Sequence, residues 1–242
     1  MTLKEILKSL ADVVFPPRCM ACGSVFDEPE GRPFCPACES RIRYITSPLC
    51  PRCGIPLSGE EGTDHFCGEC LRDPPPFSAA RAVARYEGVL LDAIHAFKYR
   101  GRITDGAILG RMMARCGYTG FDISAFTLIV PVPLHRRRLR ERGFNQAVIL
   151  AGEIAGRFGL PLDVRSLRRR IYTEPQVGLG KGHRTANVRG AFGVVDGGRI
   201  EGQRIVLVDD VYTTGSTVRE CAEILMKSKA AEVAVLTLAR AV

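Results

Sequence analysis

The stretch that decides the fold is Arg204-Ile-Val-Leu-Val-Asp-Asp-Val-Tyr-Thr-Thr-Gly-Ser-Thr217. Its apolar run, Ile205 to Val208, is too short for a helix and lacks polar alternation, which predicts a strand buried on both faces, as in a parallel sheet. A hydroxyl-rich loop follows, and apolar residues at helical spacing from Val218 to Leu225 predict a helix after it. Such a strand–loop–helix unit directs backbone N–H groups and a positive helix end at one spot, which favours phosphate binding.

Two carboxylates, Asp209 and Asp210, stand between the apolar run and the loop. They would repel a phosphate, but carboxylates accept hydrogen bonds from ribose hydroxyls and also hold divalent metals. A phosphate beside a diol indicates a ribose 5-phosphate. The alternative is a buried strand followed by an ordinary helix N-terminus that Ser216 or Thr217 caps.

The stretch resembles the phosphoribosyl-pyrophosphate (PRPP) motif of type I phosphoribosyltransferases. The resemblance implies that Asp209 and Asp210 are the catalytic pair that holds the ribose 2′- and 3′-hydroxyls. It also implies that the loop holds the 5′-phosphate through Thr213, Thr214, Gly215, Ser216 and Thr217. Mg²⁺ would accompany PRPP in such a site and bridge the pyrophosphate and the sugar hydroxyls.

Composition bounds the architecture. The 242 residues allow one domain of ordinary size plus a small module, and a hydrophobic content of 46% allows a core. No apolar run approaches the roughly 18 residues of a membrane span, and charged residues interrupt the N-terminus where a signal peptide would be apolar. We therefore expect a cytoplasmic protein without membrane insertion. Apolar residues from Leu3 to Val14 share one helical face, which predicts a helix that packs on the protein's own body or, alternatively, on a partner.

Eight of the ten cysteines form four Cys-x-x-Cys pairs: Cys19/Cys22, Cys35/Cys38, Cys50/Cys53 and Cys67/Cys70. Two such pairs supply the four thiolates of a tetrahedral zinc site, and four protein ligands leave no open position, so we expect two structural zinc ions. The spacing favours two successive ribbons, but cross-bracing of pair one with three and pair two with four stays open. Redox chemistry of the pairs is the main competing interpretation, and replacement of one cysteine by His65 is a further alternative.

Asp73-Pro74-Pro75-Pro76 predicts a linker, because consecutive prolines stiffen the chain and remove hydrogen-bond donors. The predicted domains are residues 1–76, an N-terminal helix with a double zinc ribbon, and residues 77–242, a phosphoribosyltransferase-like domain. Residues 1–76 hold eight Lys/Arg and eleven Asp/Glu, a balance of −3; because the whole chain carries +8, residues 77–242 carry +11. The larger domain is therefore the one suited to anionic ligands.

Strands and helices are predicted to alternate after the linker. Strands are expected at 80–86, at 126–132 and around Val206 and Val235; helices are expected at 89–97, about 104–116 and 145–158. This alternation predicts an α/β fold, a parallel sheet with helices on both faces, preceded by the cysteine-rich module. Ligands of such sheets bind beyond the carboxyl ends of the strands, where the acid pair lies.

Two further segments are candidate anion sites. Five arginines follow a predicted strand end and suit the pyrophosphate or DNA, since guanidinium groups form paired hydrogen bonds with phosphates: Arg136, Arg137, Arg138, Arg140 and Arg142. The alternative is a solvated basic loop. The glycine-rich segment 176–187 suits a mobile flap over a charged ligand through Gln176, Lys181, Arg184 and Asn187, or is an ordinary surface loop.

Over nearly its whole length the chain resembles the ComF family of competence-associated proteins. The matching pieces are the cysteine pairs, Phe97-Lys98-Tyr99, Pro131-Val132-Pro133, Arg142-Gly143-Phe144-Asn145-Gln146, Gln176, Arg184, Asn187 and residues 204–217. The resemblance implies a phosphoribosyltransferase-like domain behind a zinc module, an intracellular bacterial protein, and a role in taking up single-stranded DNA during natural transformation. It assigns 136–142 as the pyrophosphate loop and 176–187 as the flap.

Three hypotheses about function are compatible with these features. The first is a PRPP-binding protein that handles single-stranded DNA, with bases stacking on Tyr99, Phe144 or Tyr172. The second is a true phosphoribosyltransferase that acts on an unidentified base-like acceptor; because the chain stops at Val242, the hood that selects the base is expected to come from 77–125 or from the ribbons, or not to exist. The third is an interaction protein whose ribbons and N-terminal helix bind a helicase or recombination protein.

Overall fold

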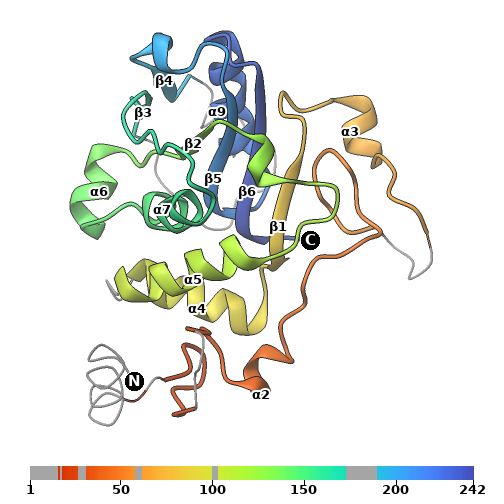
Figure 1. Ribbon diagram of the computed structural model, residues 1–242, viewed down its shortest axis with the longest axis vertical. Helices are drawn as coiled ribbons and strands as arrows, with labels where there is room; N and C mark the ends of the chain where they lie inside the picture. Colours follow the sequence, from red (N-terminus) through yellow and green to blue (C-terminus); the bar gives the residue numbers. More distant parts are fainter. Residues whose placement is uncertain (1–15, 17, 27–30, 58–61, 100–102, 173–189) are drawn as a thin grey trace.

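The computed structural model describes residues 16, 18–26, 31–57, 62–99, 103–172 and 190–242 (Figure 1). The predicted N-terminal helix and the four flap residues Gln176, Lys181, Arg184 and Asn187 lie outside these ranges. Among the helices that are described, none is long and apolar enough to cross a membrane.

A parallel four-stranded sheet forms the centre of the molecule, in the order β1-β6-β5-β2 (Figure 1). Its strands are β1 (Ala80–Arg85), β6 (Glu232–Arg240), β5 (Arg204–Tyr212) and β2 (Leu128–Pro131). The register pairs β5 with β6 from Arg204↔Glu232 to Tyr212↔Arg240, and with β2 from Leu128↔Ile205 to Pro131↔Val208. The predicted α/β fold with a parallel sheet is confirmed.

Strand β5 runs further than its apolar run indicates. We expected the strand to end at Val208, but it continues through both acids to Tyr212, because β6 continues beside it and pairs with Asp209, Val211 and Tyr212. Polar residues can extend a strand wherever the neighbouring strand supplies backbone hydrogen bonds. The acids therefore stand on a hydrogen-bonded strand and not on a loop.

Helices cover both faces of the sheet, as the alternation of elements predicts. Helices α4 (Gly88–Tyr99), α5 (Ile103–Arg115) and α7 (Gln146–Phe158) share one core with Val206 and Val208 of β5. Helix α9 (Ser216–Lys227) packs on the opposite face against Ile205 and Leu207. Successive side chains of a strand point to opposite faces of the sheet. The continuous apolar run 205–208 therefore contributes to a core on each face.

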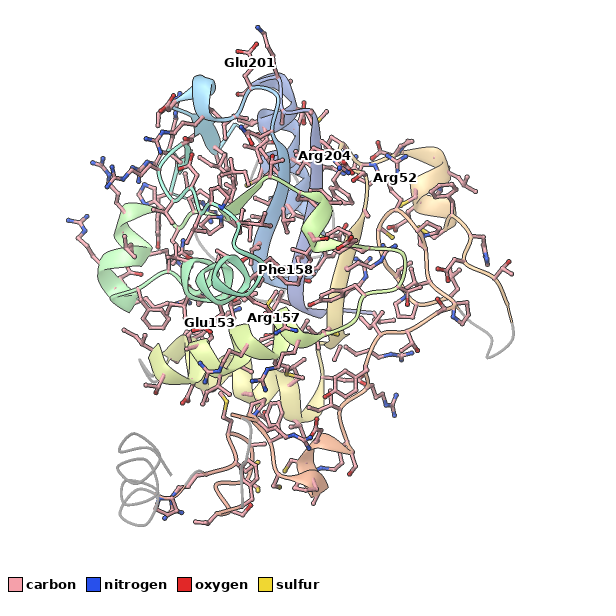
Figure 2. All side chains as sticks on the ribbon, viewed as in Figure 1. Arg52, Glu153, Arg157, Phe158, Glu201 and Arg204 are labelled. Atoms are coloured by element: carbon pink, nitrogen blue, oxygen red, sulfur yellow. The ribbon has the colours of Figure 1, made fainter. Side chains whose placement is uncertain are left out.

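A glycine allows close packing between α5 and α7. A Cβ atom on Gly110 would lie 2.8 Å from the Glu153 side chain and 3.3 Å from the Leu150 Cα atom, so a larger residue would push the helices apart. Figure 2 labels Glu153 on α7, where it also forms an ion pair of 3.6 Å with Arg111 of α5. This closely packed helix pair belongs to the core on one face of the sheet.

The shorter elements connect this framework. They are α2 (Pro36–Glu39), α3 (Gly68–Arg72), α6 (Arg136–Arg142), and the 3-10 turns η1 (Ile123–Ala125) and η2 (Gly197–Arg199). Strands β3 (Leu167–Arg169) and β4 (Phe192–Val194), which the sequence did not predict, form a separate antiparallel ribbon. This ribbon flanks the segment in which the predicted flap residues lie.

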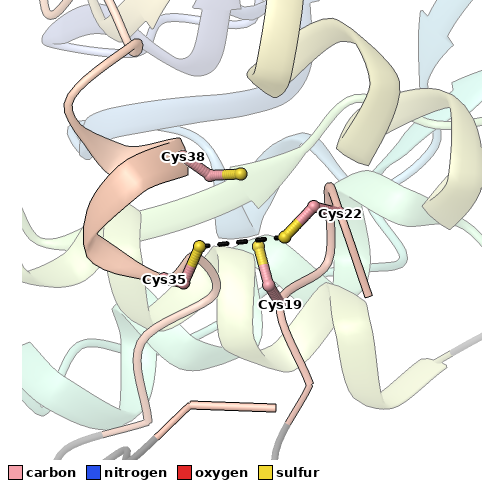
Figure 3. Close-up of side chains that lie close together, drawn as sticks. All are labelled: Cys19, Cys22, Cys35 and Cys38. Atoms are coloured by element: carbon pink, nitrogen blue, oxygen red, sulfur yellow. Dashed lines mark hydrogen bonds between the residues drawn. The ribbon is translucent and has the colours of Figure 1, made fainter. Parts of the chain in front are cut away.

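The eight paired cysteines form two clusters of four, and each cluster joins successive pairs: Cys19, Cys22, Cys35 and Cys38 in the first, and Cys50, Cys53, Cys67 and Cys70 in the second. Figure 3 shows the first cluster, in which the sulfurs of Cys22 and Cys35 are 3.8 Å apart. The Cys53 and Cys67 sulfurs are 3.7 Å apart. Ligands at about 2.3 Å from a tetrahedral zinc ion have sulfurs about 3.8 Å apart, so the thiols fit zinc.

The two cysteine modules contact different parts of the larger domain (Figure 1). Phe34 and Ile42 of the first belong to the core that contains α4 and α5. The second lies along β1, where the Ala80 N–H donates to the Arg52 carbonyl at 2.7 Å and Arg81 donates to the Pro51 carbonyl at 2.9 Å. The boundary near residue 76 stays a prediction, since both modules pack tightly on the larger domain.

A double substitution tests the pairing of the cysteines. The change Cys22→Ser with Cys38→Ser removes two ligands from the first cluster only, so the variant should keep about one of its two zinc ions. The measurement is zinc per chain by mass spectrometry of the purified protein. The matched control, Cys22→Ser with Cys53→Ser, strikes both clusters and should lose both ions. Cross-braced pairing reverses the two results.

Candidate functional site

The acid pair lies at the carboxyl edge of the sheet, at the end of a central strand. Asp209 is partly buried and Asp210 is buried, with 8% of its surface exposed. The Asp210 backbone N–H donates to the Asp209 carboxylate at 2.8 Å. Both acids stand on one hydrogen-bonded strand, so their carboxylates can accept hydrogen bonds from a small polar group such as a diol.

Lys98, near the end of α4, forms an ion pair with Asp210. Its ammonium nitrogen is 2.5 Å from the Asp210 Oδ2 atom, and only 17% of the lysine side chain and 11% of the aspartate side chain are exposed. No role for Lys98 was predicted from the sequence, although it lies in the stretch Phe97-Lys98-Tyr99. The sequence offers one hint, a lysine directly after the apolar Phe97, which is fully buried in the structure. Only the fold shows that this lysine contacts Asp210.

The charges of this group are balanced within the protein. Burial and the neighbouring Asp210 raise the pKa of Asp209 to about 8. Burial lowers the pKa of Lys98, but the attraction of Asp210 outweighs it and the net change is upward. At neutral pH the site therefore holds a protonated lysine and favours a proton on Asp209. A cation or hydroxyl donor that binds the acids must replace part of the stabilisation that Lys98 and the proton on Asp209 give to the two carboxylates.

The loop after β5 forms the beginning of α9. Gly215 has φ +77° in the left-handed region, and a Cβ atom there would lie 2.3 Å from the Tyr212 hydroxyl oxygen, so glycine is required on both counts. Gly215 is also the N-cap, and α9 begins at Ser216 without a side-chain cap. The alternative in which Ser216 or Thr217 caps an ordinary helix is wrong, because both residues lie inside the helix.

This uncapped helix start has the geometry of an anion cradle. The Thr214 and Ser216 hydroxyl oxygens lie 2.8 Å apart, and the Ser216 N–H is a long 3.4 Å from Thr214 Oγ1. Thr213 is exposed, and Thr214, Ser216 and Thr217 are partly exposed. The N–H groups of the first helical turn and these hydroxyls can therefore donate to a phosphate placed over the loop.

The five arginines form a helix, and the expectation of a loop is wrong. Helix α6 spans Arg136–Arg142; His135 caps it by accepting from the Arg137 N–H at 3.2 Å, and Gly143 ends it. A seven-residue helix distributes its side chains around an axis, so the five cannot all reach one ligand.

Their surroundings differ accordingly. Arg136 and Arg140 are exposed, and Arg138 is partly buried. Arg137 pairs with Glu141 at 3.0 Å and lies 4.6 Å from the Tyr172 ring centre, and Arg142 lies 5.5 Å from the Tyr99 ring centre.

Arg169 of β3 is a site residue that sequence reasoning missed. Burial lowers its pKa; Arg138 also lowers it, while Cys221 and Asp209 act in the opposite direction. Arg169 is therefore within electrostatic reach of both Arg138 and Asp209. It is the middle residue of Arg168-Arg169-Arg170, and its two neighbours are exposed. The sequence does not show which of the three arginines points inward, because this depends on the register of the strand.

Two models of known families match the chain. A double zinc ribbon domain matches residues 10–71, and a phosphoribosyl transferase domain matches residues 145–241. Among solved structures, the glutamine PRPP amidotransferase of B. subtilis complexed with ADP and GMP aligns over 55% of this chain and 25% of its own, at 24% identity and a TM-score of 0.38. The zinc ribbon match agrees with the two cysteine clusters.

Curated relatives match most of the chain. The DNA utilization protein YhgH of Salmonella typhimurium is 36% identical over 85% of this chain and 89% of its own length. Competence protein F of Haemophilus influenzae is 31% identical over 93% and 97%, and competence protein ComFC of Bacillus subtilis is 30% identical over 92% and 94%. With the zinc ribbon and phosphoribosyltransferase domains in this order, the chain belongs to the ComF family of competence proteins.

Proposed function

We propose that this chain is a cytoplasmic protein that binds PRPP, or a related phosphorylated ribose, and acts in the uptake or processing of single-stranded DNA during natural transformation. The observation that carries the proposal is the single β5–loop–α9 unit, which joins the acid pair to an uncapped helix start. The names of the relatives, which refer to competence and DNA utilization, support the biological role.

Each part of the unit has a distinct task in this proposal. The N–H groups and hydroxyls of 213–217 hold the 5′-phosphate, and Asp209 and Asp210 accept hydrogen bonds from the ribose diol. Arg138 and Arg169, on the β2 side of the acids, stabilise the pyrophosphate. Carboxylates are hard oxygen donors that fit Mg²⁺, so the same acids would hold that ion, which would neutralise charge on the pyrophosphate. Lys98 must then release Asp210 or share it.

Single-stranded DNA fits the surface that surrounds α6. Arg136 and Arg140 are exposed one helical turn apart, and Tyr99 is 74% exposed beside Arg142. Arginines can follow the phosphates while tyrosines stack on bases. Phe144 is a poorer platform than the sequence indicates, because it stacks on the buried Phe97 with ring centres 5.4 Å apart. The net charge of +11 on residues 77–242 favours the same ligand.

An active phosphoribosyltransferase is the second candidate. The observation that favours it is the arrangement along the sheet edge: the basic residues lie on the β2 side of the acid pair, and a cavity bordered by Tyr86, Thr214 and Arg240 lies on the β6 side. In this reaction Asp209 and Asp210 orient the ribose, while the arginines stabilise the negative charge that develops on the leaving pyrophosphate. A helicase or recombination protein that binds the zinc modules is a compatible partner.

The change Asp210→Asn tests the sugar-phosphate site. It keeps the shape of the side chain but removes the charge that accepts hydrogen bonds, each of which contributes about 1.5–3 kcal/mol, so the affinity for PRPP with Mg²⁺ should fall about 10- to 100-fold. Calorimetry measures the affinity. The control is Asp196→Asn, at an exposed residue that pairs with Arg199 and precedes the amino end of β5, whereas the acids stand near its carboxyl end. Equal binding by wild type and Asp210→Asn would contradict the proposal.

Salt dependence tests the DNA surface. Binding of a thymidine 20-mer should weaken steeply with salt because counterions are released, and Arg136→Gln with Arg140→Gln should lower the slope of log affinity against log salt by about 1.4. Fluorescence anisotropy measures both quantities. The control, Arg199→Gln with Lys227→Gln, removes the same charge from ion-paired residues elsewhere. If both double variants behave alike, or if binding ignores salt, α6 does not bind DNA.

A further inference from the structure

A cavity of about 480 Å³ lies between the second cysteine module and the carboxyl edge of the sheet. Its wall on the module side includes Cys53, Ile55 and Asp73, and its wall on the sheet side includes Tyr86, Thr214 and Arg240. We call it the ribbon cavity. Its volume lies in the range of pockets that hold small organic ligands. One side of the candidate 5′-phosphate loop therefore faces a space that the zinc module helps to enclose.

The position of the cavity relative to the acids is set by the strand order. Its sheet-side residues stand at or just after the ends of β1, β6 and β5, whereas α6 follows β2 at the other side of the acid pair. Tyr86 lies near the acids as well, since Lys98 and Asp210 both act on its pKa, which burial raises. A ribose over Asp209 and Asp210 would thus have the basic residues on one side and the ribbon cavity on the other.

The cavity wall differs chemically from the α6 surface. The guanidinium group of Arg240 is 4.0 Å from the Tyr212 ring centre and donates to the Cys53 carbonyl at 2.7 Å. Arg240 is only 7% exposed, and its Nε–H group finds no acceptor among the described residues. Arg219 is already paired with Asp73 at 3.0 Å.

The charge of the cavity disfavours a second phosphate in its interior, beyond the 5′-phosphate loop at its edge. Zinc with four thiolates carries two negative charges, and Cys53 and Cys70 of that cluster border the cavity. Arg240 offsets part of this charge, so a neutral ligand fits better than an anion. The partly exposed Tyr86 adds an aromatic ring to the wall, and Tyr212 borders the cavity with one ring face covered by Arg240. A planar, uncharged ring with hydrogen-bonding edges meets these conditions.

We propose that the ribbon cavity binds a nucleobase ring, and that the second cysteine module thereby forms the base-selecting wall of the site. The inference rests on the proposed sugar-phosphate site. In a substitution at a sugar C1 atom, the incoming and leaving groups can occupy opposite faces of the ring. The C1–O bond breaks with its electron pair on pyrophosphate, a ring-nitrogen lone pair forms the new bond, and the proton of that nitrogen passes to solvent.

Cavity-filling variants test the proposal. The probe is the fluorescent base 2-aminopurine, titrated with and without ribose 5-phosphate and Mg²⁺, which offer no leaving group. Ile55→Trp fills the cavity from the module and Ala241→Phe fills it from the sheet edge. Each should weaken binding of the probe at least tenfold while zinc content and ribose 5-phosphate affinity stay within twofold of wild type. The matched control is Leu71→Trp, on α3 of the same module at a position 67% exposed.

The outcomes separate the two claims. If wild type binds ribose 5-phosphate but not the probe, or if filled variants with normal zinc content bind the probe as wild type does, the cavity does not hold a base. If ribose 5-phosphate itself fails to bind, the sugar-phosphate site is wrong. A second titration uses 2-aminopurine inside a thymidine 12-mer. If Ile55→Trp weakens binding of this oligonucleotide as it weakens binding of the free base, the cavity takes bases of single-stranded DNA; if Ile55→Trp leaves oligonucleotide binding unchanged, the cavity takes a free acceptor.

Discussion

Strand β5 is hydrogen-bonded to β6 on one side and to β2 on the other, and the candidate site depends on this pairing. The apolar residues 205–208 contribute alternately to two cores, which fixes the strand in both directions across the sheet. The pairing with β6 then carries the backbone past the acids to Tyr212. Asp209 and Asp210 therefore stand on a strand that its neighbour holds in register, while the turn at Gly215 starts α9 a few residues away. Because the acids and the loop belong to one continuous segment, the distance between the diol site and the phosphate site is fixed.

The same burial that fixes the acids makes their charges costly. Two adjacent carboxylates that are largely shielded from water cannot both ionise freely. Lys98 balances the charge of Asp210, and the pKa of Asp209 is raised. A sugar-phosphate ligand brings hydroxyl donors for the acids and an anion for the helix start. The basic residues on the β2 side and the more neutral ribbon cavity on the β6 side then divide the surroundings of the sugar into two chemically different regions.

The sequence predicted the parts whose determinants are local. The strand, the acids, the glycine turn and the helix of 204–217 are contiguous, and the Cys-x-x-Cys pairs carry their own spacing, so both were identified in advance. Helix α6 was expected as a loop, because five arginines obscure the weak helical signal of a seven-residue segment. Lys98 and Arg169 meet the site through contacts distant in sequence, so no local pattern marks them. The packing of the second module against β1 depends on backbone groups such as those of Arg52 and Ala80, which any residue possesses.

The central claim is that one niche binds a ribose diol and its 5′-phosphate together. A crystal structure of the full chain with PRPP and Mg²⁺ tests it most directly. The account predicts the 5′-phosphate over the N–H groups of 214–217, the 2′- and 3′-hydroxyls within hydrogen-bond distance of Asp209 and Asp210, and a lengthened contact between Lys98 and Asp210. A ligand bound elsewhere, with the contact between Lys98 and Asp210 unchanged and the loop empty, would contradict it.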